Sequence, residues 1–474
     1  MPPSYAVSCC SELAGALGSS VSFPGDLDYS NSEASYFSKQ EGLLTPRCVV
    51  HPETSADVAK FISVVTGITN CEFAIKTHGH APAAGAANVQ NGVTLDLRWL
   101  NSTSISEDHS VASVEVGSAW VDVYRTLNPF GKTINGGRNG AVGVGGVTLG
   151  GGISYYSPQV GWTCDTVVNF EVVLGSSKII NANATSNPDL FRALKGGGNN
   201  FGVVTRIDFK TTNTLDVRGG HLVQSGDYVE PILTAVANIA AAKKYDVHAS
   251  IVTSCIFNST SKEWTISSAP IYTLPELNPP VYHELFAIPN ITAQSSASIS
   301  NISTLTAEPQ IPQLYQTFVT STYAASPKLL IDLFNAANAT VRSMQFPADV
   351  RWSIAFEPLP TVFTQQGEER NVLGTSKADG NGVVLLAGAS WTDPNSAQFG
   401  QALGPKIVKA MDDTAAKAGG LHRFRYLNYA DPNQDVLGSY GEDNLAFLRA
   451  TSRRYDPHGV FQKQVPGGFK LGLY

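Results

Sequence analysis

The sequence predicts an α+β protein of two lobes in which β-sheets are flanked by helices. The chain has 474 residues, which exceeds one average domain. Its content of 43% hydrophobic and 15% charged residues is typical of a globular protein with a sizeable core. Short runs rich in Val and Ile, bounded by Gly, Asn or Asp, alternate with helical patterns along the chain. This alternation favours an α+β or α/β lobe.

The first 214 residues are expected to form an N-terminal arm and one lobe. The arm, residues 1–40, contains a short helix over residues 12–17. In the lobe, residues 41–214, a helix over residues 56–65 follows Thr54 or Ser55, and either of these can act as its N-cap. Strands are expected over residues 73–75, 93–97, 113–116, 167–174, 178–180 and 203–209.

The pattern changes after residue 214, and residues 215–420 are expected to form a central second lobe. A β-sheet flanked by helices fits this region, with the broad face of the sheet free to cover a ligand. The last residues, 421–474, are again rich in Gly, Tyr and Asn, which predicts that they return to the first lobe. In the central lobe we expect helices over residues 231–243, 327–343 and 396–418, and strands over residues 247–257, 263–270, 349–357 and 383–390.

Charge and hydropathy exclude several classes of partner. The net charge of −7 and the pI near 5.7 argue against binding to nucleic acid or to an anionic membrane. No stretch approaches the roughly 20 apolar residues of a membrane span. His78 and His80 are close in sequence, but no neighbouring carboxylate or third histidine completes a metal site, so no metal is expected.

The cysteines and sequons bear on the cellular compartment. The six cysteines are too sparse for a disulfide scaffold and lack the C-x-x-C spacing of metal sites. A bridge from Cys9 or Cys10 to Cys48 or Cys71 is possible, and the sequence leaves its connectivity open. The first residues have neither the charged nor the apolar region of a signal peptide, so such a peptide is absent or already removed. Sequons occur at Asn101, Asn183, Asn258, Asn290, Asn301 and Asn338, a small excess over the roughly four or five expected by chance. From this small excess we expect a secreted protein, with an intracellular location as the alternative.

Two glycine-containing segments are the most informative feature of the chain. Residues 76–80 (KTHGH) follow an apolar run, and residues 143–152 (GVGGVTLGGG) place six glycines in ten positions. Glycine at this density disfavours both core packing and helix formation. It is typical of a main chain that lies directly against a large flat or phosphorylated ligand.

Three better-known motifs do not fit these segments. The dinucleotide fingerprint Gly-x-Gly-x-x-Gly does not fit. If Gly143 and Gly145 are its first two glycines, the third must be residue 148, which is a threonine. Gly131 is followed by Lys and Thr as in a P-loop, but Thr126 stands where the earlier glycine is required. No Gly-x-Ser-x-Gly elbow of a serine hydrolase occurs.

Taken as a set, several segments resemble the flavin-binding module of the vanillyl-alcohol oxidase superfamily. The nearest subgroup is the berberine-bridge-enzyme-like oxidases, many of which are fungal. The resemblance implies a PCMH-type FAD-binding domain formed by the N- and C-terminal segments, with residues 215–420 as the substrate domain. The matching segments, in the family's order, are residues 73–80 (FAIKTHGH), 85–88 (GAAN), 92–97 (GVTLDL), 142–152 (VGVGGVTLGGG), 165–168 (DTVV), 194–205 (LKGGGNNFGVVT), 426–431 (YLNYAD), 440–441 and 455–457.

The resemblance assigns His80 to covalent attachment of the cofactor. In the family, the histidine that ends a Gly-Gly-His turn is bonded to the flavin 8α-methyl carbon, and the bond raises the potential of the flavin. His78 departs from this pattern because glycine is usual at its position. The main chain from Thr77 to Ala81 is expected to face the pyrophosphate. The residues expected to bind FAD are Lys76, Thr77, His78, Gly79, His80, Ala81, Gly85, Gly137, Asn139, Val142, Gly143, Gly146, Gly150, Gly151, Gly152, Gly202, Val204 and Asn428.

Two further positions concern a second attachment and the electron acceptor. Many relatives bond flavin C6 to a cysteine just before the glycine run, but Asn139 occupies that position and Cys164 lies too far along. We therefore expect no cysteinyl link. Two positions before Asn139, the family places a residue that governs oxygen access to the flavin. Gly137 leaves room there, which predicts molecular oxygen as the acceptor.

Tyr429 is the predicted catalytic residue. It aligns with a tyrosine or histidine that relatives hold over the flavin. A phenol with a pKa near 10 is a poor base at neutral pH, so a nearby cation and the electron-poor flavin are expected to lower its pKa. Strand alternation would place Tyr426 and Asn428 on the opposite face from Tyr429, where they support the cofactor.

The sequence thus predicts a monomeric FAD-dependent oxidase that transfers a hydride from a small-molecule substrate to the flavin. A phenolic or polyketide-like secondary metabolite is the preferred substrate class. The first alternative is a secreted oligosaccharide oxidase, which would have a wide, aromatic-lined trough in the central lobe. The second is a flavin-containing pericyclase or binding protein without redox chemistry.

Overall fold

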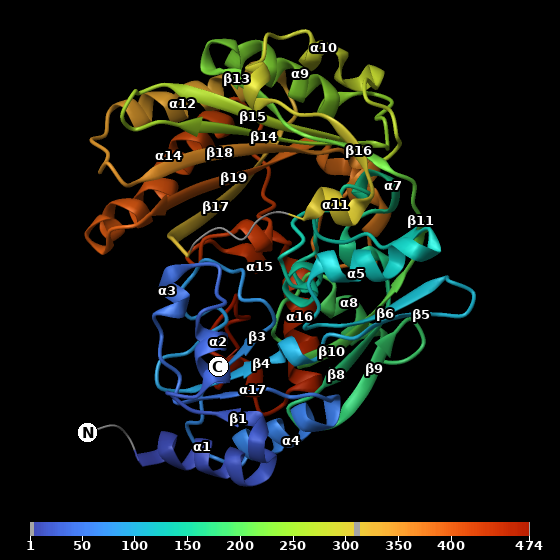
Figure 1. Cartoon of the computed structure of the whole chain (residues 1–474), viewed down its shortest axis with the longest axis vertical. Helices are drawn as coiled ribbons and strands as arrows, with labels where there is room; N and C mark the ends of the chain where they lie inside the picture. Colours follow the sequence, from blue (N-terminus) through green and yellow to red (C-terminus); the bar gives the residue numbers. More distant parts are fainter. Residues whose placement is uncertain (1–3, 308–312, 474) are drawn as a thin grey trace.

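The computed structural model describes residues 4–307 and 313–473, which form two lobes stacked along the long axis of the molecule (Figure 1). Both ends of the chain lie in the lower lobe of the figure, and the middle of the chain forms the upper lobe. The predicted α+β fold class is confirmed.

Two β-sheets form most of the framework of the lower lobe. In the smaller sheet, β2, β4 and β3 run parallel in that spatial order, and β1 pairs antiparallel with β2. The larger sheet has the order β5-β6-β10-β8-β9 and is antiparallel. The strands are β1 (Val21–Ser22), β2 (Cys48–Val50), β3 (Phe73–Lys76), β4 (Val93–Asp96), β5 (Thr103–Ile105), β6 (Val111–Glu115), β8 (Val167–Val173), β9 (Ile179–Asn183) and β10 (Val203–Lys210), with β7 (Lys132–Thr133) and β11 (Thr212–Asn213) as a separate pair.

Short helices surround these sheets. A capping box explains why helix α4 begins where it does. The Thr54 side chain accepts a hydrogen bond from the Asp57 backbone N–H, and the Asp57 side chain accepts one from the Thr54 backbone, so Thr54 is the N-cap. The helices of this lobe are α1 (Ser4–Leu17), α2 (Leu27–Glu33), α3 (Lys39–Gly42), α4 (Ser55–Thr66), α5 (Trp120–Leu127), α6 (Val144–Leu149), α7 (Ser157–Val160), α8 (Pro188–Leu194), α15 (Val436–Ser439), α16 (Glu442–Tyr455) and α17 (Val460–Lys463).

Two disulfides attach α1 to the smaller sheet. Cys9 pairs with Cys71 just before β3, and Cys10 pairs with Cys48 at the start of β2. These pairings settle the connectivity that the sequence left open.

The upper lobe is an antiparallel sheet with helices on one face. Its strand order is β16-β12-β15-β14-β18-β19-β17, and β13 also pairs with β15. Helices α9, α12 and α14 cover the face turned away from the lower lobe (Figure 1). The strands are β12 (Val217–Gly219), β13 (Leu222–Ser225), β14 (Ala249–Phe257), β15 (Trp264–Tyr272), β16 (Ser298–Ser300), β17 (Tyr315–Ala324), β18 (Arg351–Leu359) and β19 (Gly382–Trp391), and the helices are α9 (Val229–Ala241), α10 (His283–Phe286), α12 (Pro327–Arg342) and α14 (Ala397–Lys417). Two short helices of the same part of the chain, α11 (Ile302–Thr306) and α13 (Thr361–Thr364), pack instead on α5 and α7 of the lower lobe.

The hydrophobic core of the lower lobe includes the C-terminal part of the chain. Phe461 packs edge-on against Phe73 of β3, and the Phe73 backbone N–H donates to the Gln464 carbonyl. Residues of the middle segment, Phe363 and Leu373 among them, also belong to this core. The lobes are therefore joined through packed side chains as well as through the connecting strands.

Three local expectations were wrong. The glycine run was not expected to be helical, yet α6 forms within it, because Val144 and Thr148 are buried and tertiary packing overrides the low helix propensity of glycine. The chain from Leu427 to Tyr429 is a 3-10 turn, so strand alternation does not apply to it. Strand β17 was not predicted, although it pairs with β19 along its whole length.

No helix in residues 4–307 and 313–473 is long and apolar enough to cross a membrane.

Removing the Cys10–Cys48 disulfide should destabilise the lower lobe. This disulfide closes a loop with a sequence separation of 38, and such a cross-link contributes about 2–4 kcal/mol by restricting the unfolded chain. A Cys10→Ser/Cys48→Ser variant should lose this amount in urea unfolding followed by tryptophan fluorescence. An unchanged unfolding midpoint would contradict the pairing.

Candidate functional site

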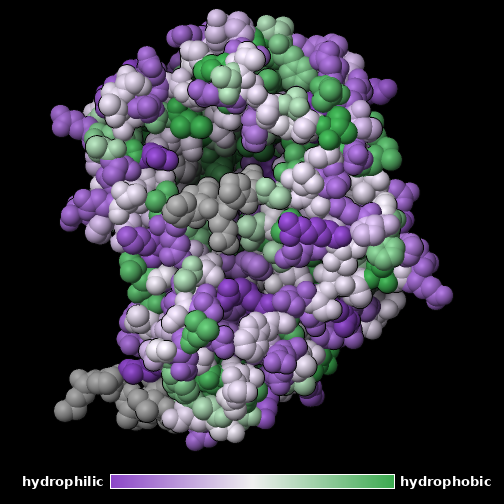
Figure 2. Space-filling model, viewed as in Figure 1, coloured by the Kyte–Doolittle hydropathy of each residue, from purple (hydrophilic) through white to green (hydrophobic). Residues whose placement is uncertain are grey.

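A cavity of about 880 Å³ lies where the two lobes meet. Figure 2 shows a hollow between the lobes on this face of the molecule. The cavity is lined by segments that are distant in sequence, namely residues within 72–90, 137–153, 198–204, 426–432 and 466–469, together with side chains of the upper sheet such as Phe318 and Leu386.

The two glycine-containing segments of the sequence analysis lie against each other at this cavity. A Cβ added to Gly143 would meet Thr77 Oγ1 at 2.9 Å and His78 Cβ at 3.0 Å. Gly79 has a φ of +62°, and a Cβ there would lie 2.5 Å from the Tyr36 ring. Glycine at position 143 therefore lets the start of α6 pack on the loop after β3, and glycine at position 79 lets that loop pass the Tyr36 ring.

Most of the predicted cofactor-binding residues line the cavity. These are Thr77, His78, Gly79, His80, Ala81, Gly85, Gly137, Asn139, Val142, Gly143, Gly146, Gly150, Gly202, Val204 and Asn428. A Cβ added to Gly85 or Gly146 would meet nothing within 4 Å, so at these two positions the main chain leaves space open in the cavity.

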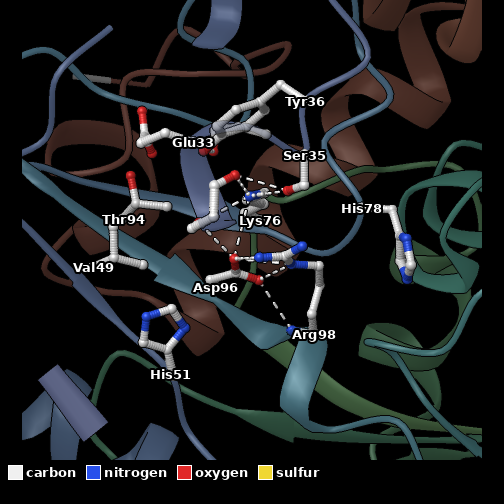
Figure 3. A network of polar contacts seen from close by, with 12 residues as sticks. Glu33, Ser35, Tyr36, Val49, His51, Lys76, His78, Thr94, Asp96 and Arg98 are labelled. Carbon is white, nitrogen blue, oxygen red and sulfur yellow. Dashed lines mark hydrogen bonds and ion pairs between the residues drawn. The ribbon is translucent and has the colours of Figure 1, made fainter. Parts of the chain in front are cut away.

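Lys76 does not line the cavity, which corrects its assignment as a cofactor-binding residue. Its Nζ donates to the Ser32 carbonyl at 2.6 Å and to Ser35 Oγ at 2.8 Å, and it lies 3.2 Å from Asp96 Oδ2. Figure 3 shows this side chain within the Asp96–Arg98 cluster, with His78 standing apart. On β3 and β4, Lys76 and Asp96 are register partners, so their side chains share one face and the ion pair forms behind the loop.

The charges of this buried pair are maintained at neutral pH. Burial alone would raise the pKa of Asp96, but Lys76 and Arg98 outweigh it and hold the pKa well below its usual value. Burial lowers the pKa of Lys76 to about 8, which keeps the ammonium protonated at pH 7.

Gly151 and Gly152 also lie outside the cavity lining. Both have positive φ values, +105° and +84°. A Cβ on Gly152 would lie 2.4 Å from Thr163 Cβ. These glycines therefore shape the turn that leaves α6 instead of contacting a ligand in the cavity.

His80 is a neutral, oriented imidazole at the cavity. Burial, with a smaller contribution from His78, lowers its pKa to about 4. Its ring stacks on Phe37 with the centroids 4.0 Å apart. The neutral ring is the form that can act as a nucleophile.

His78 has a structural contact that the sequence did not predict. Its Nε2 lies 2.9 Å from the Gly117 carbonyl, and burial lowers its pKa. The neutral ring then donates to that carbonyl, which holds the loop against the segment after β6.

Tyr429 belongs to a three-residue polar cluster. Its hydroxyl donates to Glu357 Oε1 at 2.9 Å, and Arg138 Nη2 donates to the same hydroxyl oxygen at 2.5 Å. Arg138 and Glu357 also form an ion pair with N···O at 3.0 Å, and their side chains are only 16% and 4% exposed. The cluster joins the segment before α6, strand β18 and the 3-10 turn at residues 427–429.

The predicted lowering of the Tyr429 pKa is wrong for the polypeptide alone. Burial raises this pKa well above 10; Arg138 opposes the increase and Glu357 adds to it. Burial also disfavours the charge on Arg138, but the Glu357 carboxylate outweighs it and raises the arginine pKa. Tyr429 is therefore a protonated phenol that donates to a carboxylate.

Sequence reasoning missed Glu357 and Arg138. On β18, Trp352, Ile354 and Phe356 point into the core of the upper lobe, and Glu357 is on the opposite face. Strand alternation could have predicted this, because the sequence predicts a strand over these residues. Nothing in the sequence signalled that this face meets Arg138.

Tyr426 and Asn428 hold the C-terminal turn on the glycine segment. The Tyr426 hydroxyl accepts from the Ile153 N–H at 3.0 Å, and Asn428 Nδ2 donates to the Val147 carbonyl at 3.1 Å. A Cβ on Gly150 would lie 2.1 Å from Asn428 Oδ1. Both residues also line the cavity, as Tyr429 does, so the predicted separation onto opposite faces is not seen.

The free cysteines do not line the cavity. Cys164 and Cys255 are both buried, and neither is among the described residues that line it. Gly137 does line it, but a Cβ there would lie 2.4 Å from Trp120 Cδ1. Packing against Trp120 thus accounts for this glycine independently of oxygen access, which stays a prediction.

Known proteins match this chain over nearly its whole length. Residues 46–183 match the FAD binding domain family. The chain is 33% identical to the FAD-dependent monooxygenase drtC of Aspergillus calidoustus, over 98% of this chain and 90% of that protein.

Solved structures share the fold at lower sequence identity. The 6-hydroxy-D-nicotine oxidase of Arthrobacter nicotinovorans superposes with a TM-score of 0.77 at 19% identity, covering 93% of this chain and 96% of that one. Berberine bridge enzyme of Eschscholzia californica gives a TM-score of 0.77 at 16% identity, covering 98% and 100%.

Breaking the ion pair behind the loop should destabilise the protein strongly. Asp96→Asn leaves the Lys76 ammonium buried without its counter-ion, which costs about 3–5 kcal/mol in the free energy of unfolding. The matched control is Asp413→Asn, which removes the exposed pair with Lys409 and should cost less than about 1 kcal/mol. Equal effects of the two substitutions in urea unfolding would contradict this role of the buried pair.

Proposed function

The chain belongs to the FAD-linked oxidoreductases related to berberine bridge enzyme, and from this we propose that it is an oxidase of small phenolic or polyketide-like substrates. In this proposal the FAD is bonded to His80 alone and molecular oxygen is the final electron acceptor. The observation that carries it is the position of a neutral imidazole and a tyrosine–carboxylate pair at one cavity.

The cavity suits a flavin dinucleotide. The loop at residues 77–81 and the start of α6 offer main chain with little side-chain bulk, and Gly85 and Gly146 leave space open. Gly198, Asn199 and residues 202–204 line the cavity as well, and we propose that they hold the adenine end. When bound, FAD supplies the hydride acceptor and passes the electrons on to oxygen.

Tyr429 and Glu357 would move the substrate proton. Because the Tyr429 hydroxyl donates to Glu357 Oε1, the phenol oxygen accepts a proton from a substrate hydroxyl while its own proton passes to the carboxylate. The proton thus ends on Glu357, and Tyr429 is unchanged. Arg138 Nη2 keeps the phenol oxygen and the carboxylate together.

Attachment through one bond is supported by the residues around the cavity. Asn139 lines it at the position where relatives carry a cysteine, and the side chain of His80 is held by Phe37. The relatedness to fungal FAD-dependent monooxygenases supports a secondary-metabolite substrate.

The disulfides support maturation in the secretory pathway. Cys9–Cys71 and Cys10–Cys48 require an oxidising compartment to form and persist. We therefore extend the proposal to a secreted enzyme.

His80→Ala should abolish covalent attachment. After denaturation the wild-type polypeptide should stay yellow, with one FAD mapped to the peptide that contains His80, whereas the variant should release all its flavin. His78→Gln is the control and should keep the bond. Flavin that stays attached to the His80→Ala chain would disprove the linkage.

The low pKa of His80 also predicts the pH range of attachment. The imidazole is neutral above its pKa of about 4 and protonated below it. Apoprotein supplied with FAD should therefore form the bond at pH 5 as well as at pH 7. A histidine with an ordinary pKa of about 6.5 would instead be largely protonated at pH 5 and would react poorly there. A yield that falls with a midpoint near pH 6.5 would contradict burial of this ring.

Tyr429→Phe and Glu357→Gln should each slow reduction of the flavin by about 10²–10⁴-fold, since each removes one partner of the proton transfer. The measurement is anaerobic bleaching of the flavin by a substrate, with peroxide release followed in air. Flavin content should stay at the wild-type level. If no phenolic alcohol bleaches the flavin of the wild-type enzyme, the pericyclase or binding protein without redox chemistry is favoured. If only oligosaccharides bleach it, the oligosaccharide oxidase is favoured.

A further inference from the structure

The face of the upper sheet that is free of helices forms one wall of the cleft between the lobes. On β18 and β19, Trp352, Ile354, Phe356, Leu385, Ala387 and Ala389 pack under the helices. Alternation places Ser353, Ala355, Glu357, Leu386 and Gly388 on the opposite face. Leu386 of this face and Phe318 of β17 line the cavity, so the face is turned towards the site.

The strand register arranges this face in rows that lead away from Glu357. Ala355 pairs with Leu386 in the next cleft-facing row, and Ser353 pairs with Gly388 in the row after it. Gly388 is also paired with Phe318 of β17. Ser353 lies four positions before Glu357 on β18, a distance of roughly 13 Å.

Gly388 has no conformational or packing reason to be glycine. Its φ lies outside the positive region. A Cβ there would meet Ser353 Oγ and the Thr317 carbonyl only at 3.8 Å and Phe318 Cδ1 at 3.9 Å. By contrast, a Cβ on Gly404 of α14 would lie 2.7 Å from Val319 Cγ2. Glycine weakens a strand interior, so its presence at residue 388 indicates that the space above it is used.

That space adjoins the catalytic end of the cavity. The Phe318 ring lies 6.4 Å from the Tyr429 ring and 5.8 Å from Phe37, which stacks on His80. A ligand whose hydroxyl reaches Tyr429 and which extends along β18 and β19 must therefore pass Phe318 and lie over Gly388.

The chemistry of this wall favours a flat, apolar ligand. Ala355, Leu386 and Gly388 carry no polar side-chain atom, and Ser353 has a single hydroxyl. Among the described residues of β18 and β19, the side chains on this face are uncharged between Glu357 and Arg351. Further residues on the same face are also small or apolar: Val252, Ser254 and Ile256 of β14, and Thr265, Ser267 and Ala269 of β15. Between Glu357 and Gly388 the wall offers one side-chain hydroxyl, that of Ser353, which is few hydrogen-bonding groups for a saccharide.

We propose that Gly388 determines specificity by making room for the distal ring of a fused-ring phenolic substrate whose hydroxyl reaches Tyr429. The proposal rests on the proposed function and adds to it the size and shape of the substrate.

The test is calorimetric binding of two probes to the flavin-loaded enzyme. The first is 1,8-dihydroxyanthraquinone, which has three fused rings, and the second is 4-hydroxybenzyl alcohol, which has one. Gly388→Val should weaken binding of the three-ring probe by about tenfold or more, because the added methyl groups occupy its position. Binding of the one-ring probe should stay within about twofold, and Gly388→Ala should be intermediate.

Ser267→Val is the matched control. It adds similar bulk on the same face but on β15, two strands away from β18, and should leave both affinities within about twofold. Unchanged flavin absorption and an unchanged melting temperature verify that each variant is folded.

Several outcomes would overturn the proposal. These are absence of three-ring binding in the wild type, equal loss of both probes in Gly388→Val, or no loss of either. The anthraquinone is bound without being oxidised, so this result is independent of turnover. If the binding pattern holds but no phenolic alcohol bleaches the flavin, the oxidase function fails while the shape of the site stands.

Discussion

The buried ion pair between Lys76 and Asp96 is the constraint on which the site depends. It joins the carboxyl ends of two parallel strands, β3 and β4, and draws in Ser32 and Ser35 from the segment around α2. The loop at residues 77–81 begins at the very next residue. Because an uncompensated buried charge is so unfavourable, the pair permits one arrangement of these strand ends and therefore one path for the loop.

Burial acts on the ionisable groups of the cavity in one direction, towards neutrality. It lowers the pKa of His80 and raises that of Tyr429, so the imidazole is unprotonated and the phenol is protonated. A carboxylate in the same surroundings needs a partner, and the Arg138 guanidinium supplies it. The result is a neutral imidazole and a protonated phenol at one cavity, beside the compensated charges of Arg138 and Glu357.

The lobes divide the chemistry between them. The lower lobe places main chain and His80 at the cavity, and its segments come from both ends of the chain. The upper lobe contributes Glu357 and the wall that contains Gly388. The Tyr429 turn returns from the C-terminal segment and meets both. Variation of the upper sheet can therefore change the substrate without disturbing the loop and α6.

The sequence alone determined the features that depend on local chemistry. The positions of Gly79 and Gly143, the strand that leads to His80 and the boundaries of α4, α12 and α14 follow from backbone freedom and periodicity, which neighbouring residues decide. The structure alone decided which distant groups meet. The pairing of Cys9 with Cys71, the withdrawal of Lys76 from the cavity and the contact of Glu357 with Arg138 and Tyr429 depend on strand register and lobe packing. Packing also made a helix of the glycine run, because burial of Val144 and Thr148 outweighs local propensity. Such contacts join residues hundreds of positions apart, and no local pattern encodes them.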